Sequence, residues 1–277
     1  MMIATALAAA AMIWALGAPL PNVWLPLAAS ALLWAVSLKW QPNLLRALAT
    51  LVVFSVSFTL LMEGAAAARL PLADNALASI DAALGLSAPV LVAWVAKHPW
   101  IALLMKCAYF SIMPQTCLLM LLNAEKPELW VFLKRFFLAA QISLCLFFFF
   151  PAEGVATCLS PPVMARFHAL RDGAPLDWQQ AQGIITFPSF HVAWGLILLA
   201  SFWKTPLRWP AVVLNGLMIA STVTTGGHYF IDVPGGVLVG LVAIMQPTAA
   251  AVSSGWSAHW WRQLTRRLAP ANSGGVG

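Results

Sequence analysis

The sequence predicts an all-α integral membrane protein with about eight transmembrane helices, whose core is a helical bundle. Three features support this prediction. Of the 277 residues, 61% are hydrophobic and only 9% are charged, whereas soluble domains carry roughly 25% charged residues. The apolar runs are nearly continuous, as in 136–150, whereas a membrane β-strand alternates apolar and polar residues. Basic residues gather in the loops between these runs, as they do in multi-pass membrane proteins.

The individual elements follow from the length of each apolar run, because a spanning helix needs about 20 mostly apolar residues. In chain order, the candidate spans are 3–20, 23–38, 45–62, 101–122, 131–150, 190–203, 211–223 and 233–251. The first run has no basic segment before it, so we interpret it as a transmembrane helix and not as a cleaved signal. The stretch 75–95 fits an amphipathic surface helix followed by a short re-entrant piece. We therefore expect N-terminal transmembrane helices (1–64), a transmembrane domain that carries the motifs described below (65–252) and a partly disordered cytoplasmic tail (253–277).

The distribution of basic residues predicts the orientation in the membrane. If both termini are cytoplasmic, one side of the membrane receives ten basic residues in short loops and at span ends: Lys39, Arg46, Lys126, Lys134, Arg135, Lys204, Arg208, Arg262, Arg266 and Arg267. The opposite side receives four, spread over longer loops: Arg69, Lys97, Arg166 and Arg171. The long loop 151–187 then faces away from the cytoplasm. The net charge of +6 is explained by topology, and without a basic cluster that has interleaved aromatics we expect no nucleic-acid partner.

Several other polar residues have simple interpretations. The four cysteines, Cys107, Cys117, Cys145 and Cys158, do not have the spacing of metal ligands, and the first three lie in apolar runs as packing residues would. Glu63 lies near the end of the span 45–62, where a carboxylate could pair with a cation near the site, although we expect it to extend toward water.

Two short motifs concentrate the polar chemistry. The sequence FPSFH occupies 187–191, where the span 190–203 begins, and GGHYFID occupies 226–232, just before the span 233–251. The predicted topology puts both on the non-cytoplasmic side. His228 and Asp232 are four positions apart, so on a helix they would share one face. A carboxylate that accepts one imidazole N–H fixes the tautomer and leaves the other nitrogen basic. His228 is therefore a candidate nucleophile toward phosphorus, with Asp232 as its orienting partner.

The remaining groups of the motifs complete a candidate site. His191 could protonate a departing alkoxide and then activate water or an alcohol. Ser189 could donate a hydrogen bond to a phosphoryl oxygen, and backbone N–H groups near Gly226 and Gly227 could add donors. Three other interpretations stay open at this point: packing histidines, a zinc site of two histidines and a carboxylate, or a transporter in which the histidines relay protons. Transporters place polar groups near the midplane, whereas these lie at one interface.

The two motifs together resemble those of the type 2 phosphatidic acid phosphatase superfamily of lipid phosphatases and phosphotransferases. The residues of the two motifs look closest to those of the branch that contains the inositol phosphorylceramide synthases and many bacterial relatives. The segments LRDG at 170–173 and FPA at 150–152 also look like that branch. The resemblance covers roughly 60–241. It implies a phosphohistidine on His228, orientation by Asp232, acid and base catalysis by His191, and phosphate binding by Ser189. The chemistry would need no metal and no organic cofactor.

The sequence also departs from the superfamily pattern. In the superfamily an arginine follows the serine seven positions before the nucleophilic histidine, and here Thr222 follows Ser221. The first superfamily motif, a lysine with Arg-Pro seven and eight positions later, is also missing. Lys106 with Met113 and Pro114 has its spacing without the arginine, and we interpret this match as accidental. A phosphate dianion needs cations. We therefore expect Arg171 and Arg166, and after them Arg69, together with Gly227, to help Ser189 bind the substrate phosphate.

The predicted function is cleavage or transfer of a phosphate or phospho-headgroup on a lipid, in a multi-pass protein of a bacterial inner membrane with its active site on the non-cytoplasmic side. One alternative is a headgroup transferase instead of a hydrolase. Another is a non-catalytic lipid-phosphate binder or a transporter. The expected partners are a lipid phosphate or phospholipid and the bilayer itself. The sequence makes no prediction of the oligomeric state.

Overall fold

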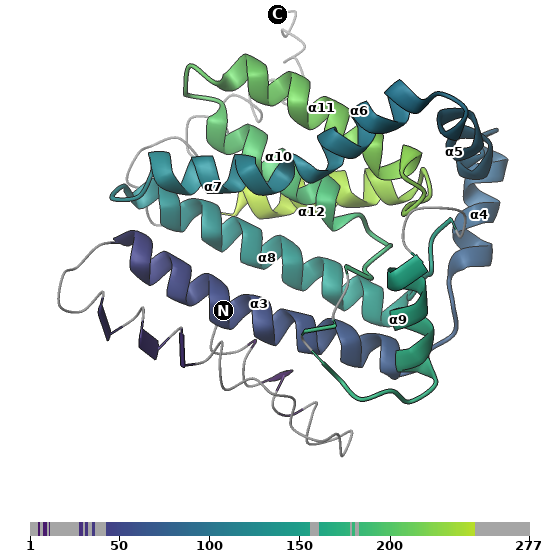
Figure 1. The fold of residues 1–277 in the computed structure, drawn as a ribbon, viewed down its shortest axis with the longest axis horizontal. Coiled ribbons are helices and arrows are strands. Elements are labelled where there is room, and N and C mark those ends of the chain that lie inside the picture. Colours follow the sequence, from purple (N-terminus) through teal and green to yellow (C-terminus); the bar gives the residue numbers. More distant parts are fainter. Residues whose placement is uncertain are drawn as a thin grey trace, which may run out of the picture.

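The computed structural model describes residues 43–155, 161–177, 179–180 and 183–246, with scattered positions before residue 43. Within these residues every regular element is a helix (Figure 1), which confirms the all-α prediction. The predicted spans 3–20 and 23–38 lie outside the described residues except for those scattered positions, and the tail 253–277 lies wholly outside them. The count of about eight transmembrane helices therefore stays a prediction.

Three helices in the described part of the chain are long and apolar enough to cross a membrane. They are α3 (Asn43–Ala67), the segment Pro99–Leu122, which comprises α6 (Pro99–Phe110) and α7 (Ile112–Leu122), and α8 (Pro127–Phe149). The number rises to four if α4 (Asp74–Ala83) and α5 (Ala88–Ala96), which meet at 85°, form one broken span. This bend falls within 75–95, where the sequence predicts a surface helix followed by a re-entrant piece.

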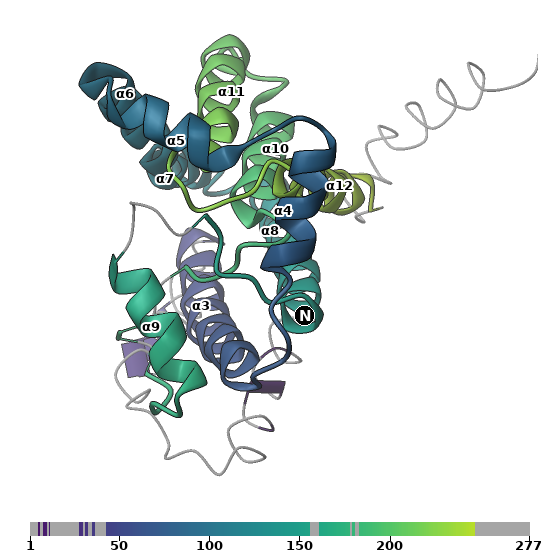
Figure 2. The same cartoon turned by 90° about the vertical axis from the view of Figure 1, so that its right-hand side faces the viewer.

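The other described helices are α9 (Pro161–Arg171), α10 (Phe190–Phe202), α11 (Arg208–Thr224) and α12 (Asp232–Met245). Helix α10 lies at the centre, in contact with α7, α8, α11 and α12, while α3 packs on α8 and α9 on α3. Helices α4, α5 and α9 gather at one end of the bundle (Figure 1, Figure 2). Helix α9 lies inside the predicted loop 151–187. It forms because Phe167 and Leu170, one turn apart, are buried in a cluster with Phe147 of α8.

The close approach of α10 and α12 depends on glycine. A Cβ atom on Gly236 of α12 would lie 2.3 Å from the carbonyl oxygen of Ser189, and one on Gly240 would lie 3.1 Å from Cα of Ala193. A side chain at either position would force the helices apart, since packed interiors leave no room of that size. Because α10 begins with one motif and α12 with the other, these glycines let the two motifs meet.

Candidate active site

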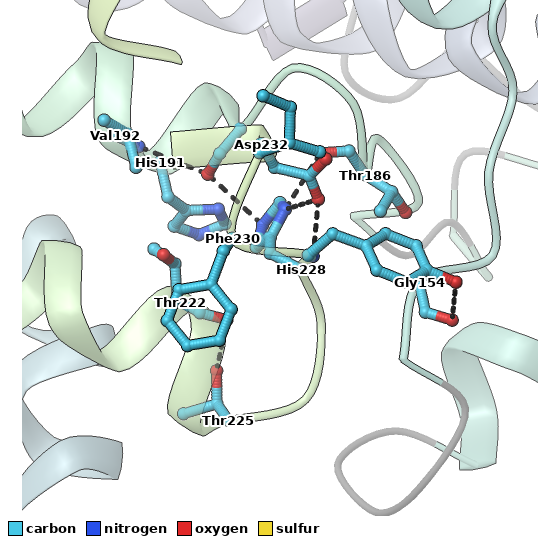
Figure 3. Close-up of polar contacts among 12 residues, drawn as sticks. Gly154, Thr186, His191, Val192, Thr222, Thr225, His228, Phe230 and Asp232 are labelled. Atoms are coloured by element: carbon cyan, nitrogen blue, oxygen red, sulfur yellow. Dashed lines mark hydrogen bonds and ion pairs between the residues drawn. The ribbon is translucent and has the colours of Figure 1, made fainter. Parts of the chain in front are cut away.

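His228 lies in the turn between α11 and α12 and is almost fully buried. Its Nδ1 atom is 2.8 Å from the backbone carbonyl oxygen of Thr186 and 3.2 Å from Oδ2 of Asp232 (Figure 3). A carbonyl and a carboxylate can only accept hydrogen bonds, so Nδ1 carries the hydrogen and donates it. The lone pair of the neutral ring is therefore on Nε2, which makes Nε2 the nitrogen that can attack an electrophile.

Asp232, the first residue of α12, connects the two motifs and is fully buried. Its Oδ2 also accepts the backbone N–H of Tyr229 at 2.8 Å. Its backbone carbonyl accepts the N–H of Ser189 at 3.1 Å. The sequence places His228 and Asp232 on one helix face, but His228 belongs to the turn before α12. The pair meets because the carboxylate turns back over the N-terminus of its own helix and accepts the Tyr229 N–H.

Ser189 and His191 face His228 from the start of α10. The Oγ atom of Ser189 is 3.3 Å from Nε2 of His228, and the hydroxyl is the donor in this contact because Nε2 holds the lone pair. The ring of His191 lies 6.4 Å from that of His228 between centroids, with the planes at 67° (Figure 3). The two imidazoles therefore belong to one site.

The backbone donors beside His228 fall into two groups. The N–H of Tyr229 is bound to Asp232, and those of Phe230 and Ile231 donate to the carboxylate of Asp81 at 2.8 and 2.9 Å. The three N–H groups at the N-terminus of α12 thus already donate to carboxylates of the protein. The N–H of Gly226 donates to the carbonyl oxygen of Val223. By contrast, within the described residues the N–H groups of Gly227 and His228 make no hydrogen bond. The donors left for a ligand are those two.

Helix α4 stabilises this turn from outside the motifs. Asp74 accepts the hydroxyl of Tyr229 at 3.0 Å and the backbone N–H of Gly154 at 3.0 Å. Burial, followed by the neighbouring Asp74 carboxylate, raises the pKa of Tyr229, so its hydroxyl remains a donor. Gly154 has φ +87°, and a Cβ there would lie 2.6 Å from the carbonyl oxygen of Gly227. Only glycine fits this position, so the segment after α8 can pack directly against the turn that carries Gly227 and His228.

A pocket of about 490 Å³ opens on the far side of Tyr229. Its wall includes three carboxylates, those of Asp74, Asp81 and Glu153. Negative charge of this density repels a phosphate group. This pocket is therefore a poor candidate for phosphate binding, and the gap between the two histidines is the better one.

The first two arginines predicted to bind phosphate have other partners. The Nε atom of Arg166 is 2.7 Å from Oε1 of Glu63, whose side chain is 0% exposed. The interpretation of Glu63 as extending toward water is thus wrong, because Arg166 neutralises it inside the protein. Arg171 donates to the carbonyl oxygen of Leu70 at 3.1 and 3.2 Å and lies over the ring of Phe167. None of these partners belongs to the two motifs.

Helix α6 brings to the site one residue, Tyr109, that the sequence analysis did not assign to it, and carries Lys106 nearby in the chain. The hydroxyl of Tyr109 is 3.3 Å from Nδ1 of His191. Lys106 is one turn earlier on α6, on the same face as Tyr109, and is exposed. Thr222, at the position of the missing arginine, is buried and donates its hydroxyl to the carbonyl of Ile219 in its own helix.

The part of the chain that the structure describes contains no group of three or more His, Cys, Asp and Glu side chains that could hold a metal ion. Independence from metal stays a prediction. The geometry instead groups two imidazoles, one carboxylate, a serine hydroxyl and two free backbone N–H groups at the meeting point of α10 and α12.

The sequence profile of the PAP2 superfamily matches residues 75–246, which is more than half of the 277-residue chain. The chain belongs to the PAP2 superfamily. The matched region contains both motifs, the bent pair α4 and α5, and α6 with Lys106 and Tyr109. PAP2 proteins are generally phosphatase-type enzymes, so membership suggests phosphatase or phosphotransferase activity for this chain. Neither a curated protein nor a solved structure gives a significant match.

Proposed function

We propose that this PAP2 protein transfers a phosphoryl group from a lipid phosphate ester in two steps, through a phosphohistidine on His228. The observation that carries the proposal is the state of the His228 ring. Its Nδ1 is held by two acceptors, and its Nε2 is turned toward Ser189 in the gap that His191 borders. A nucleophile, its orienting carboxylate and a second imidazole within one site are the groups that covalent transfer to phosphorus requires.

In the first step, Nε2 of His228 attacks phosphorus and the bond from phosphorus to the lipid oxygen breaks. That oxygen leaves as an alcohol after receiving the Nε2 proton of an imidazolium on His191. The phosphorylated ring of His228 still donates its Nδ1–H to Asp232, whose negative charge stabilises the positive charge on the ring. The Ser189 hydroxyl, no longer bound to Nε2, is free to donate to a phosphoryl oxygen together with the N–H groups of Gly227 and His228.

In the second step, the neutral ring of His191 removes a proton from water or from an acceptor alcohol. The resulting oxygen nucleophile attacks phosphorus, and the bond from phosphorus to Nε2 of His228 breaks. Both histidines then return to the states in which they began. Water as the acceptor makes the protein a phosphatase, and an alcohol makes it a headgroup transferase.

The charge balance at the site favours a phosphodiester as the donor. Arg166 and Arg171, which the sequence predicts as phosphate ligands, hold other partners, so we place Lys106 ahead of them as the source of positive charge. Lys106, the His191 imidazolium and the Asp232 carboxylate together carry a net charge of +1, which leaves a phosphate monoester dianion only partly compensated. A phosphodiester carries a single negative charge. This preference supports a headgroup transferase of the inositol phosphorylceramide synthase type as the form of the activity to test first.

The test is to trap the covalent intermediate. The purified protein is incubated with phosphatidic acid, polyprenyl diphosphate and phosphodiester lipids, each labelled in the phosphate, with and without diacylglycerol or ceramide as acceptor. An acid-labile, base-stable label on the protein is expected with the wild type and none with His228→Ala. His191→Ala should retain the label but slow turnover by about 10²–10⁴-fold, and Asp232→Asn should slow labelling.

A matched control is His168→Ala, because His168 is exposed on α9 and its loss should leave labelling unchanged. Label on His228→Ala but not on His191→Ala would reverse the two roles. Turnover that chelators abolish and zinc restores would point to a metal site instead. No label and no product with any donor would leave lipid-phosphate binding or transport as the better account.

A further inference from the structure

Tyr109 makes two separate contacts with the ring of His191. Its hydroxyl lies 3.3 Å from Nδ1. Its ring stacks on the imidazole, with centroids 4.4 Å apart and planes at 28°. One contact fixes the edge of the imidazole and the other covers a face, so together they limit rotation of the ring about both of its side-chain torsions.

The fold places Tyr109 at this point through the junction of α6 and α7. Helix α6 packs on α11, whereas α7 packs on α10. The chain changes direction between them at Ser111, whose hydroxyl donates to the carbonyl oxygen of Ala108. Phe110 supports the Tyr109 ring edge-on, with centroids 5.4 Å apart. Tyr109 therefore projects from the end of a helix that is anchored independently of α10.

The chemistry of His191 determines which way the hydrogen bond must run. As an imidazolium, His191 has a hydrogen on each nitrogen, so Nδ1–H can only donate, and the Tyr109 oxygen accepts it. When Nε2 has given its proton to the leaving group, the neutral ring keeps the Nδ1–H that Tyr109 holds. The free lone pair is then on Nε2, the nitrogen that must next take a proton from water or alcohol.

We propose that Tyr109 is a positioning residue of the reaction, which selects the Nδ1–H tautomer of His191 and so assigns proton transfer to Nε2. This inference rests on the proposed function. It gives both histidines the same arrangement, in which Nδ1 is held by an acceptor and Nε2 faces the gap. The acceptors differ in charge: His228 has the carboxylate of Asp232, which stabilises a positively charged ring. His191 has a neutral phenol, which lets its ring gain and lose a proton in every cycle.

The kinetic test uses Tyr109→Phe, which removes the hydroxyl and keeps the stacked ring. It should lower kcat about 5- to 10-fold, the effect of one neutral hydrogen bond, without changing KM. The loss should shrink when the donor has a nitrophenolate leaving group, which needs no proton. It should also vanish in a His191→Ala background. A matched control is Trp100→Phe, which changes an exposed aromatic residue at the other end of α6 and should leave kcat unchanged. An equal loss with and without His191 would overturn the proposal.

A second measurement does not require turnover. In protein labelled with ¹⁵N-histidine, the His191 signals are identified by their loss in His191→Ala. The neutral ring should show the Nδ1–H tautomer in the wild type and a mixture of tautomers in Tyr109→Phe. If the wild-type ring shows the Nε2–H tautomer, or if Tyr109→Phe does not alter it, the proposal fails. Absence of activity in the wild type would refute the proposed function alone, because the tautomer is read directly.

Discussion

Lys106 matters at the scale of single residues because positive charge is scarce around the two histidines. Arg166 is committed to buried Glu63, and Arg171 to a carbonyl and an aromatic ring. Thr222 brings no charge, and its hydroxyl is bound to its own helix. Lys106 has no hydrogen-bond or ion-pair partner among the described residues and lies one turn from Tyr109. Lys106, whose spacing to Pro114 we interpreted as accidental, thus lies on the helix that contacts His191 through Tyr109.

Lys106→Met should therefore weaken catalysis. The loss of one charged hydrogen bond to phosphate corresponds to about a 10- to 100-fold decrease in kcat/KM. The matched control is Lys97→Met, which removes an equally exposed lysine at the end of α5. Steady-state kinetics with a phosphodiester donor measures both variants. If Arg171→Ala or Arg166→Ala lowers kcat/KM more than Lys106→Met at equal thermal stability, the original assignment of those arginines is restored.

The residues that the sequence predicted are the ones whose side chains carry recognisable chemistry in a short motif. His228, Asp232, Ser189 and His191 do lie together. The others were hidden for physical reasons. Thr186 acts through its backbone carbonyl, which no side-chain pattern can reveal. Tyr109 lies in an apolar run, where an aromatic residue is usually interpreted as a membrane-interface residue and not as part of a polar site. Asp81 accepts hydrogen bonds from a turn 149 residues away in the chain, and such pairing is set by the fold alone.

At the scale of elements, the glycine-containing face of α12 determines how the site is assembled. Gly236 lies against the backbone at Ser189, and Gly240 against Ala193. Each glycine in a helix costs up to about 1 kcal/mol of stability relative to alanine. In return, the two glycines allow α10 to approach closely, so that the N–H of Ser189 can donate to the carbonyl oxygen of Asp232.

Gly236→Ala should consequently separate α10 from α12 and impair the site. Its Cβ would lie 2.3 Å from a backbone oxygen, which cannot move away as a flexible side chain could. We expect a loss of about 1–3 kcal/mol of stability and a larger relative loss of kcat. Gly216→Ala on α11 is the matched control, because its Cβ meets nothing within 4 Å, and it should keep or raise stability. Thermal unfolding in detergent and initial rates measure both. Equal behaviour of the two variants would contradict this account.

The positions of the apolar helices were predictable. The predicted bounds 190–203 and 211–223 agree closely with those of α10 and α11, because a run of apolar residues in lipid must satisfy its backbone as a helix. That α10 and α11 cross the membrane stays a prediction. The break at Ser111 divides the predicted span 101–122 in two. Pro114 has no N–H to donate to the carbonyl of Phe110, and an interior proline breaks or kinks a helix. The sequence therefore contained a signal for this break, which the prediction of one continuous span did not use. Helix α9 was missed because it is short, because Arg166, His168 and Arg171 interrupt or follow its apolar residues, and because the apolar residues find their partners on distant helices.

At the scale of the whole molecule, the orientation in the membrane can be tested directly. Basic residues lie around the connection between α10 and α11, whereas the turn before α12 carries none. We therefore predict that the histidines face away from the cytoplasm. In a background with all four cysteines replaced by serine, a membrane-impermeant maleimide should label Ser87→Cys in intact cells, and Pro206→Cys only after permeabilisation. Both positions are exposed. The reverse labelling pattern would invert the orientation.

The lengths of the two central helices have a further consequence. Helices α10 and α12 contain 13 and 14 residues, so each rises about 20 Å, about 10 Å less than the hydrocarbon thickness of a typical bilayer. If the opposite ends of both helices reach the cytoplasmic surface, the mismatch falls at the end where the histidines lie. The bilayer then has to thin there, or headgroups and water have to fill the difference. On the proposed function, His228 would lie below the plane of the surrounding headgroups, where a lipid can present its phosphorus while its acyl chains stay in the membrane.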